Sequence, residues 1–168
     1  MKLFRRHSER GQTLVEFGLL IPIVMLMMVG LFDLGRVVFI NNSLSDGARD
    51  GARHASTDPR DAGYCARVDD AVRSATRGQP LTPYTVTFTT IDGAGNTLTT
   101  YVVCQNGLNG PGLAAMTADT QVGPGDRVTV DLGANVDLIL GFIADAAGTS
   151  SFALEAESTM QVTFAPAP

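Results

Sequence analysis

The sequence predicts an α+β protein, in which a long N-terminal helix precedes a small antiparallel sheet of about four strands with one packed helix. Three observations support this fold class. An apolar segment near the N-terminus is long enough to cross a membrane, small and apolar residues continue beyond it at helical spacing, and β-branched runs separated by turn residues fill the C-terminal half. The chain has 168 residues, of which 45% are hydrophobic, and this composition excludes a disordered chain.

The apolar segment predicts a transmembrane helix. Residues 17–32 contain no charged or strongly polar side chain, and between residues 14 and 40 the only charges are Glu16, Asp33 and Arg36. A helix of that length spans roughly 40 Å at ~1.5 Å per residue, which is enough to cross a hydrocarbon core of about 30 Å. We therefore predict a basic leader over residues 1–11 and a transmembrane helix over residues 12–40.

Charge predicts the orientation of this helix. Residues 1–13 carry a net charge of +3, whereas residues 37–168 carry seven Arg and fourteen acids, a net charge of −7. The basic end is expected in the cytoplasm and the acidic remainder outside, so the protein would cross the cytoplasmic (inner) membrane once. An acidic exterior without a Lys/Arg run also argues against nucleic acid as a partner. A cleavable secretory signal is the alternative, but no A-x-A-like site follows the apolar segment.

The helix is expected to continue in water to about residue 55, because small and apolar residues recur every three or four positions. This soluble part, residues 41–56, is amphipathic. Gly47, Gly51 and Ala55 form a row of small side chains along which another helix could approach closely. The sequence leaves open whether the row packs against another subunit or against the chain's own exterior part.

Residues 57–168 are expected to form the exterior α+β domain. Asp58 and Pro59 end the first helix, and a second helix is predicted over residues 61–76, where the apolar side chains fall on one face. Residues 105–126 are rich in Gly, Asn and Pro and predict a loop. The β-branched and alternating runs predict strands over residues 84–90, 97–104, 126–140 and 151–164.

Two cysteines, Cys65 and Cys104, fall in this exterior domain. An even pair in an oxidising compartment suggests one disulfide closing a loop of about 40 residues, worth roughly 4 kcal/mol by loop entropy. Two free buried thiols are the alternative. We expect no metal site, because these cysteines and the distant His7 and His54 lack ligand spacing.

The sequence contains no recognisable catalytic arrangement. Nucleophile-elbow, metalloprotease and phosphate-loop motifs are missing, and the two histidines would lie on opposite sides of the membrane. We therefore expect neither enzymatic activity nor a cofactor.

The two acids in the predicted span need an explanation, because an ionised carboxylate at the membrane centre costs about 2.5–3.5 kcal/mol, and less near the interface. Asp33 can pair with Arg36 three residues on, which predicts a salt bridge at the outer interface. Glu16 has no basic residue at i+3 or i+4. Cleavage after Gly11 would supply a positive charge instead. The new N-terminal amine of Gln12 would lie four residues before Glu16, on the same side of the helix.

The stretch "RRHSERGQTLVEFGLLIPIVMLMMVGLFDLGRVVFINNSLSDGARDGARHAS" resembles the N-terminal signature of TadE-like proteins. These are minor pilins or pseudopilins of the tight adherence (Flp) pilus, a branch of the type IV pilus machinery. The closing "LEAESTMQV" is similar to the family's last strand. The matching N-terminal elements are Gly11, Gln12, Glu16, Phe17, Pro22, Asp33, Gly35, Arg36 and the repeat "DGARDGAR".

The resemblance implies that an inner-membrane prepilin peptidase cuts between Gly11 and Gln12. Glu16 would become the fifth mature residue and would pair with the N-terminal amine of a neighbouring subunit, which sets axial register. Phe17 fits the aromatic of the family motif, and Pro22 resembles its helix-kinking proline.

The implied partners are the prepilin peptidase, other pilins or pseudopilins and an inner-membrane assembly platform, and the processed chain would enter the pilus. A permanently anchored, exported binding protein of the cell envelope is the alternative function.

Overall fold

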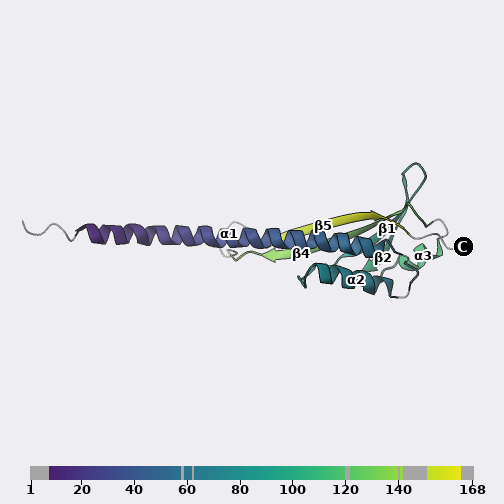
Figure 1. Ribbon diagram of the computed structural model, residues 1–168, viewed down its shortest axis with the longest axis horizontal. Coiled ribbons are helices and arrows are strands. Elements are labelled where there is room, and N and C mark those ends of the chain that lie inside the picture. The colour runs from purple at the N-terminus through teal and green to yellow at the C-terminus, as the bar shows by residue number, and fades with distance from the viewer. Residues whose placement is uncertain are drawn as a thin grey trace, which may run out of the picture.

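The computed structural model describes residues 8–57, 59–61, 63–119, 122–139, 141 and 151–163. Most of the predicted leader lies outside the described residues. Figure 1 shows one long helix that projects from a small domain built by the remaining elements. In chain order the elements are α1 (Ser8–Ala55), α2 (Tyr64–Ala75), β1 (Thr85–Ile91), β2 (Thr97–Gln105), β3 (Leu108–Asn109), α3 (Leu113–Ala118), β4 (Arg127–Asp137) and β5 (Ser151–Gln161).

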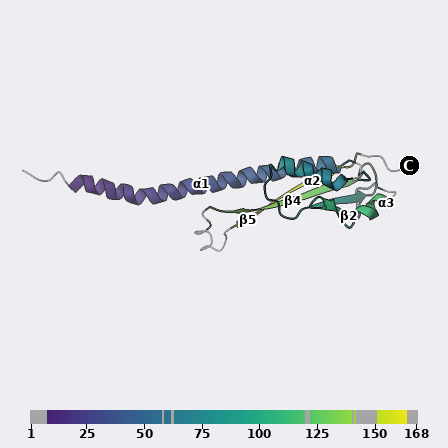
Figure 2. The ribbon, with the colours of Figure 1, turned by 90° about the horizontal axis from the view of Figure 1, so that it is seen from below.

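The first element, α1, is one uninterrupted helix, which confirms the prediction of a single helix through the apolar and the amphipathic segments. It is long and apolar enough to cross a membrane, and its most apolar window is not buried in the domain. Pro22 lies inside it. Because proline has no N–H, the carbonyl of Gly18 lacks its usual helical donor. Figure 2 shows α1 gently bowed and unbroken.

The sheet is entirely antiparallel, with strand order β3-β2-β1-β4-β5. The predicted α+β class is therefore confirmed, with one more strand than the four expected. The longest pairing joins β4 to β5, from Arg127 opposite Gln161 to Asp137 opposite Ser151. Both strands are shorter at their C-terminal ends than predicted.

The prediction of an unstructured loop over residues 105–126 was wrong in two places. Asn106 and Gly107 both have positive φ values, 50° and 78°, and turn the chain so that β3 folds back onto the end of β2. A short helix, α3, follows and buries Met116. A two-residue strand and a six-residue helix are too short to produce a periodic sequence pattern.

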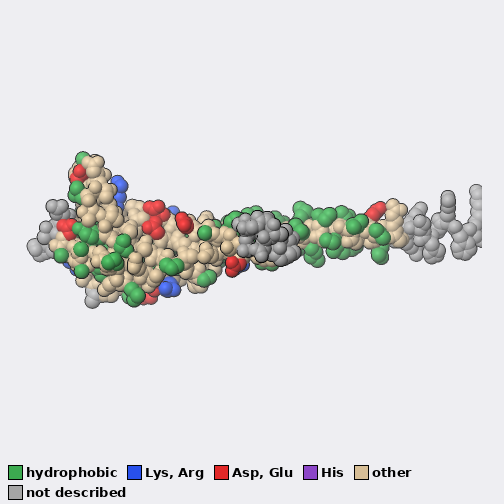
Figure 3. All heavy atoms as spheres, turned by 180° about the vertical axis from the view of Figure 1, so that it is seen from behind, with side chains coloured by type: hydrophobic (Ala, Val, Ile, Leu, Met, Phe, Trp, Pro, Cys, Tyr) green, Lys and Arg blue, Asp and Glu red, His purple; other side chains and the backbone are tan. Residues whose placement is uncertain are grey.

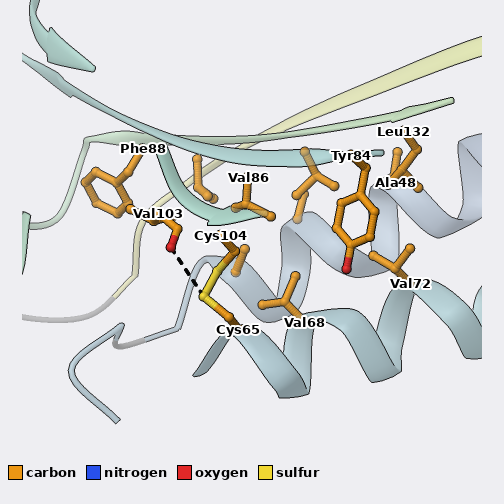
Figure 4. Packing of buried hydrophobic residues seen from close by; sticks show 14 of the residues in the cluster. Ala48, Cys65, Val68, Val72, Tyr84, Val86, Phe88, Val103, Cys104 and Leu132 are labelled. Atoms are coloured by element: carbon orange, nitrogen blue, oxygen red, sulfur yellow. Dashed lines mark hydrogen bonds between the residues drawn. A yellow bond between two sulfur atoms is a disulfide. The ribbon is translucent and has the colours of Figure 1, made fainter. Parts of the chain in front are cut away.

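The hydrophobic core lies between the helices and one face of the sheet. Figure 4 shows side chains from α1, α2 and the strands meeting there. Alternation along β1 explains the division of its residues, since Val86 and Phe88 are buried while the intervening threonines are half-buried and face the other side. Fully buried or nearly buried core members include Leu44, Ala48, Ala52, Val68, Val72, Val86, Phe88, Val128, Val130 and Leu132.

Candidate assembly and membrane site

The first half of α1 stands free of the domain. Residues 11–32 are exposed apart from Val29 and Gly30, which are half-buried. At ~1.5 Å per residue this segment is roughly 33 Å long, close to the thickness of a hydrocarbon core. In Figure 3 hydrophobic side chains cover this part of the molecule. A helix that is apolar on all sides is stable only when lipid or other helices surround it.

Glu16 lies near the N-terminal end of this free segment. Its carboxylate accepts a hydrogen bond from the side-chain amide of Gln12, with Nε2 3.1 Å from Oε1. The amide is neutral, so this bond satisfies one oxygen without neutralising the charge. This side-chain contact adds to the role predicted for the Gln12 amine, and the i,i+4 spacing of Gln12 and Glu16 is typical of such pairs.

The predicted cleavage point lies just before that contact. Gly11 is exposed, and a Cβ added to it would have no heavy atom within 4 Å. Phe17, beside the glutamate, is also exposed. The roles of Gly11, Gln12, Glu16, Phe17 and Pro22 stay predictions.

Asp33 and Arg36 of α1 form hydrogen bonds with the backbone at the end of β4 and just beyond it. The buried carboxylate of Asp33 accepts a hydrogen bond from the backbone N–H of Ile139, with Oδ1 2.9 Å from the nitrogen. The guanidinium of Arg36 donates to the carbonyl oxygen of Asp137 over 3.0 Å. The salt bridge expected between the two side chains stays a prediction. The sequence did not predict the contacts of these side chains with Asp137 and Ile139, because those residues are more than 100 positions away in the chain.

The row of small residues contacts the chain's own domain. A Cβ on Gly47 would lie 2.5 Å from Cγ2 of Thr76, and one on Gly51 would lie 2.6 Å from Cγ2 of Val72. Ala55 is fully buried, and its carbonyl accepts a hydrogen bond from the Tyr64 hydroxyl. Of the two arrangements left open by the sequence, the structure therefore shows the one within the chain, in which α2 approaches α1 along this row.

Residues 11–53 match the family model described as TadE-like protein. Residues 11–53 of α1 are thus similar to TadE-like proteins. The match confirms the resemblance found in the sequence and includes Glu16, Pro22, Asp33, Gly47 and Gly51. It ends within α1, so it does not extend to the sheet. No curated protein and no solved structure matches the chain significantly.

The domain on the TadE-like helix contains one disulfide. Cys65 of α2 and Cys104 of β2 are joined, with their Cα atoms 5.6 Å apart. The bond fixes the N-terminal turn of α2 against the sheet. The Sγ atom of Cys65 also lies 3.3 Å from the carbonyl oxygen of Val103, as Figure 4 shows. A disulfide sulfur carries no proton, so this is a packing contact and not a hydrogen bond.

A polar contact also holds α2 to the sheet. Asp69 accepts hydrogen bonds from Nε of Arg73, over 2.7 Å, and from the hydroxyl of Tyr84. Partial burial acts to raise the pKa of Asp69, but the hydrogen bonds from Arg73 and Tyr84 outweigh it and leave the pKa below the ordinary value of 3.8. The ionised carboxylate is therefore the form that stabilises the fold.

Acidic side chains gather on the outer face of the sheet, opposite the TadE-like helix. Asp131 of β4 lies opposite Glu157 of β5, with Glu155 two residues along. Partial burial, followed by repulsion from Glu157 and Glu155, raises the pKa of Asp131. Among the described residues, no group of three or more His, Cys, Asp or Glu side chains could hold a metal ion.

Proposed function

We propose that this chain is a minor pilin or pseudopilin of a tight adherence (Flp-type) pilus or of a related secretion apparatus. The observation that carries the proposal is the free TadE-like helix, exposed along most of residues 11–32 with Glu16 near its start. An apolar surface of this extent needs lipid before assembly and the helices of other subunits after it. Both environments are available to a membrane-inserted pilus subunit.

Processing would complete the charge pair at the start of the helix. A prepilin peptidase would cut between Gly11 and Gln12 and leave a positive amine on Gln12. In an apolar filament core, an unpaired carboxylate is costly, so Glu16 would favour the position that brings it next to such an amine. The amine of a neighbouring subunit would then fix the axial register.

The charge asymmetry of the chain supports the orientation. The basic residues before the helix would stay in the cytoplasm and the acidic domain would lie outside, anchored in the inner membrane. From there an inner-membrane assembly platform would extract the processed subunit and add it to other pilins.

Substitution of Glu16 tests this proposal. Glu16→Ala should leave membrane insertion unchanged and lower incorporation into sheared pili about tenfold, the effect of a lost interaction of about 1.4 kcal/mol. Asp46→Ala is the matched control, because Asp46 is an exposed acid on the same helix outside the apolar segment. Equal incorporation of both variants would contradict the register role of Glu16.

Intact-mass measurement of the protein from its native host tests the processing step. Under conditions in which pili form, the chain should begin at Gln12. Retention of residues 1–11 would favour the alternative, a permanently anchored exported protein. Leucine substitutions in the Gly47, Gly51, Ala55 row do not separate these two functions, because the row is buried against the chain's own α2 and β4.

A further inference from the structure

We infer that the membrane-proximal end of the sheet is a second lipid contact, in which the side chains of Ile139 and Phe152 rest in the outer interface of a phospholipid bilayer. This inference rests on the proposed insertion of α1 in a membrane. Ile139 is 60% exposed and Phe152 is 47% exposed, although both are large apolar residues. They lie at the end of the domain from which the free apolar segment of α1 emerges.

The height of Ile139 along the helix follows from its contact with Asp33. Because the Ile139 N–H lies 2.9 Å from the Asp33 carboxylate, the two residues are at the same level. Asp33 directly follows the exposed apolar segment, whose length of roughly 33 Å fills a hydrocarbon core of about 30 Å. Ile139 is therefore placed where the hydrocarbon ends and the headgroups begin.

Phe152 lies slightly farther from the membrane centre. It is opposite Val136 in the sheet, three residues before Ile139, which corresponds to about 10 Å at ~3.3 Å per residue. The headgroup layer adds roughly 5–7 Å on each side of the hydrocarbon core. Transmembrane helices are usually tilted by about 20° from the membrane normal. A tilt of α1 toward the side that carries the domain shortens the distance from Phe152 to the membrane and brings this side chain into the headgroup layer.

The helix continues this apolar surface beyond Asp33. Leu34, Val38 and Phe39 are 60%, 51% and 45% exposed, so the exposed apolar side chains do not stop where the domain begins. Such a surface at the boundary between a membrane span and a soluble domain is continuous with the lipid-facing helix. A bilayer therefore fits this surface better than a separate protein partner does. Such a partner would need a surface complementary to both the helix and the end of the domain.

Among the described residues, the charges near this contact nearly cancel. Arg36 and Arg77 are exposed near this level, and the guanidinium of Arg77 lies 5.8 Å from the centroid of the Phe39 ring. Asp33 and Asp137 lie at the same end of the domain and offset these two positive charges. We therefore expect insertion of apolar side chains, to the same depth in zwitterionic and in anionic bilayers.

Depth measurement with a fluorescent probe tests the inference. A polarity-sensitive fluorophore is attached through Ile139→Cys in the full chain, held as one copy per phosphatidylcholine nanodisc. This substitution keeps the bond to Asp33, because that bond uses the backbone N–H of Ile139. Met25→Cys, in the middle of the free segment, reports insertion of α1. Leu98→Cys is the matched control, since Leu98 is 54% exposed and is the second residue of β2, at the far end of the domain.

The expected result is a blue-shifted spectrum at position 139, quenched most strongly by lipids that carry a nitroxide near the headgroup, with a water-like spectrum at position 98. A water-like spectrum at 139 together with a quenched probe at 25 would overturn the lipid contact and leave the proposed function intact. An unquenched probe at 25 would overturn membrane insertion itself. Blue-shifted emission at 139 that lipid nitroxides do not quench would also overturn the inference, because the probe would then be covered by protein.

Discussion

The carboxylate of Asp33 accepts a hydrogen bond from the backbone N–H of Ile139, 106 positions later in the chain. This bond attaches the chain just beyond β4, which ends at Asp137, to the helix at the point where the free apolar segment ends. Together with the bond from Arg36 to the carbonyl of Asp137, it determines how far along α1 the domain reaches. The position of the domain relative to a membrane therefore depends on two side chains of the helix.

Removal of the Asp33 carboxylate should loosen this end of the sheet. Asp33→Ala leaves the Ile139 N–H without its acceptor, and a hydrogen bond to a charged group is worth about 1.5–3 kcal/mol. Hydrogen exchange at Ile139 should therefore become at least about tenfold faster. The amides of β1 and Asp46→Ala serve as controls that should not change. Unaltered protection of Ile139 in Asp33→Ala would show that packing alone holds the end of β4.

A methyl group added in the small-residue row should destabilise the domain. The Cβ of Gly51→Ala would lie 2.6 Å from Cγ2 of Val72, so α1 and α2 must separate, at a cost of about 1–3 kcal/mol. Gly35→Ala is the control, because no heavy atom lies within 4 Å of its Cβ position. That change should stabilise the helix by up to about 1 kcal/mol. The unfolding midpoints of both variants are measured by thermal unfolding, followed by tyrosine near-ultraviolet circular dichroism. Equal midpoints for Gly51→Ala and Gly35→Ala would refute the close contact.

The disulfide between Cys65 and Cys104 should contribute strongly to stability. It closes a loop with a sequence separation of 39 residues, and loop entropy gives about 4 kcal/mol for a loop of this length. Reduction, or replacement of both cysteines by alanine, should lower the unfolding midpoint of the domain. Helicity of the apolar segment should stay unchanged, because the bond lies in the exterior domain. A midpoint insensitive to reductant would show that the two residues are not joined in solution.

Asp69 should make the domain sensitive to acid. Its pKa in the folded chain lies below 3.8, so its stabilising effect is present above the ordinary pKa and is lost as the pH falls through the lowered value. Asp69→Asn should cost about 1–2 kcal/mol at pH 7, because two hydrogen bonds to a charged acceptor become weaker or are lost. Denaturant unfolding from pH 7 to pH 2 should show the difference shrink at low pH. A constant difference would mean that the charge of Asp69 is unimportant.

Asp131 should show the opposite dependence. Its pKa is raised in the folded chain, so its charge opposes folding above the ordinary value of 3.8, and this penalty disappears at lower pH. Asp131→Asn should therefore raise stability slightly at pH 7 and leave it unchanged near pH 3. The same unfolding series measures the effect. A loss of stability at pH 7 would indicate that the carboxylate makes a favourable contact on the outer face.

Several features could be predicted because their causes are local in the chain. The length and apolarity of the first segment predict α1, and alternation along residues 84–90 predicts β1. The N-terminal motif also identified the TadE-like segment. In contrast, β3 and α3 were not predicted. The turn into β3 depends on the positive φ values of Asn106 and Gly107, and α3 packs through one buried side chain, Met116. Neither feature creates a periodic pattern.

By itself, the sequence determined that a helix of membrane-spanning length precedes an α+β domain, since hydrophobicity and periodicity act along neighbouring residues. The tertiary structure alone decided which surface each part of α1 faces. Gly51 turned out to contact the chain's own Val72, and Asp33 was shown to bind the end of β4. Both contacts depend on the packing of segments distant in sequence, which local patterns do not specify because several partners satisfy the same pattern equally well.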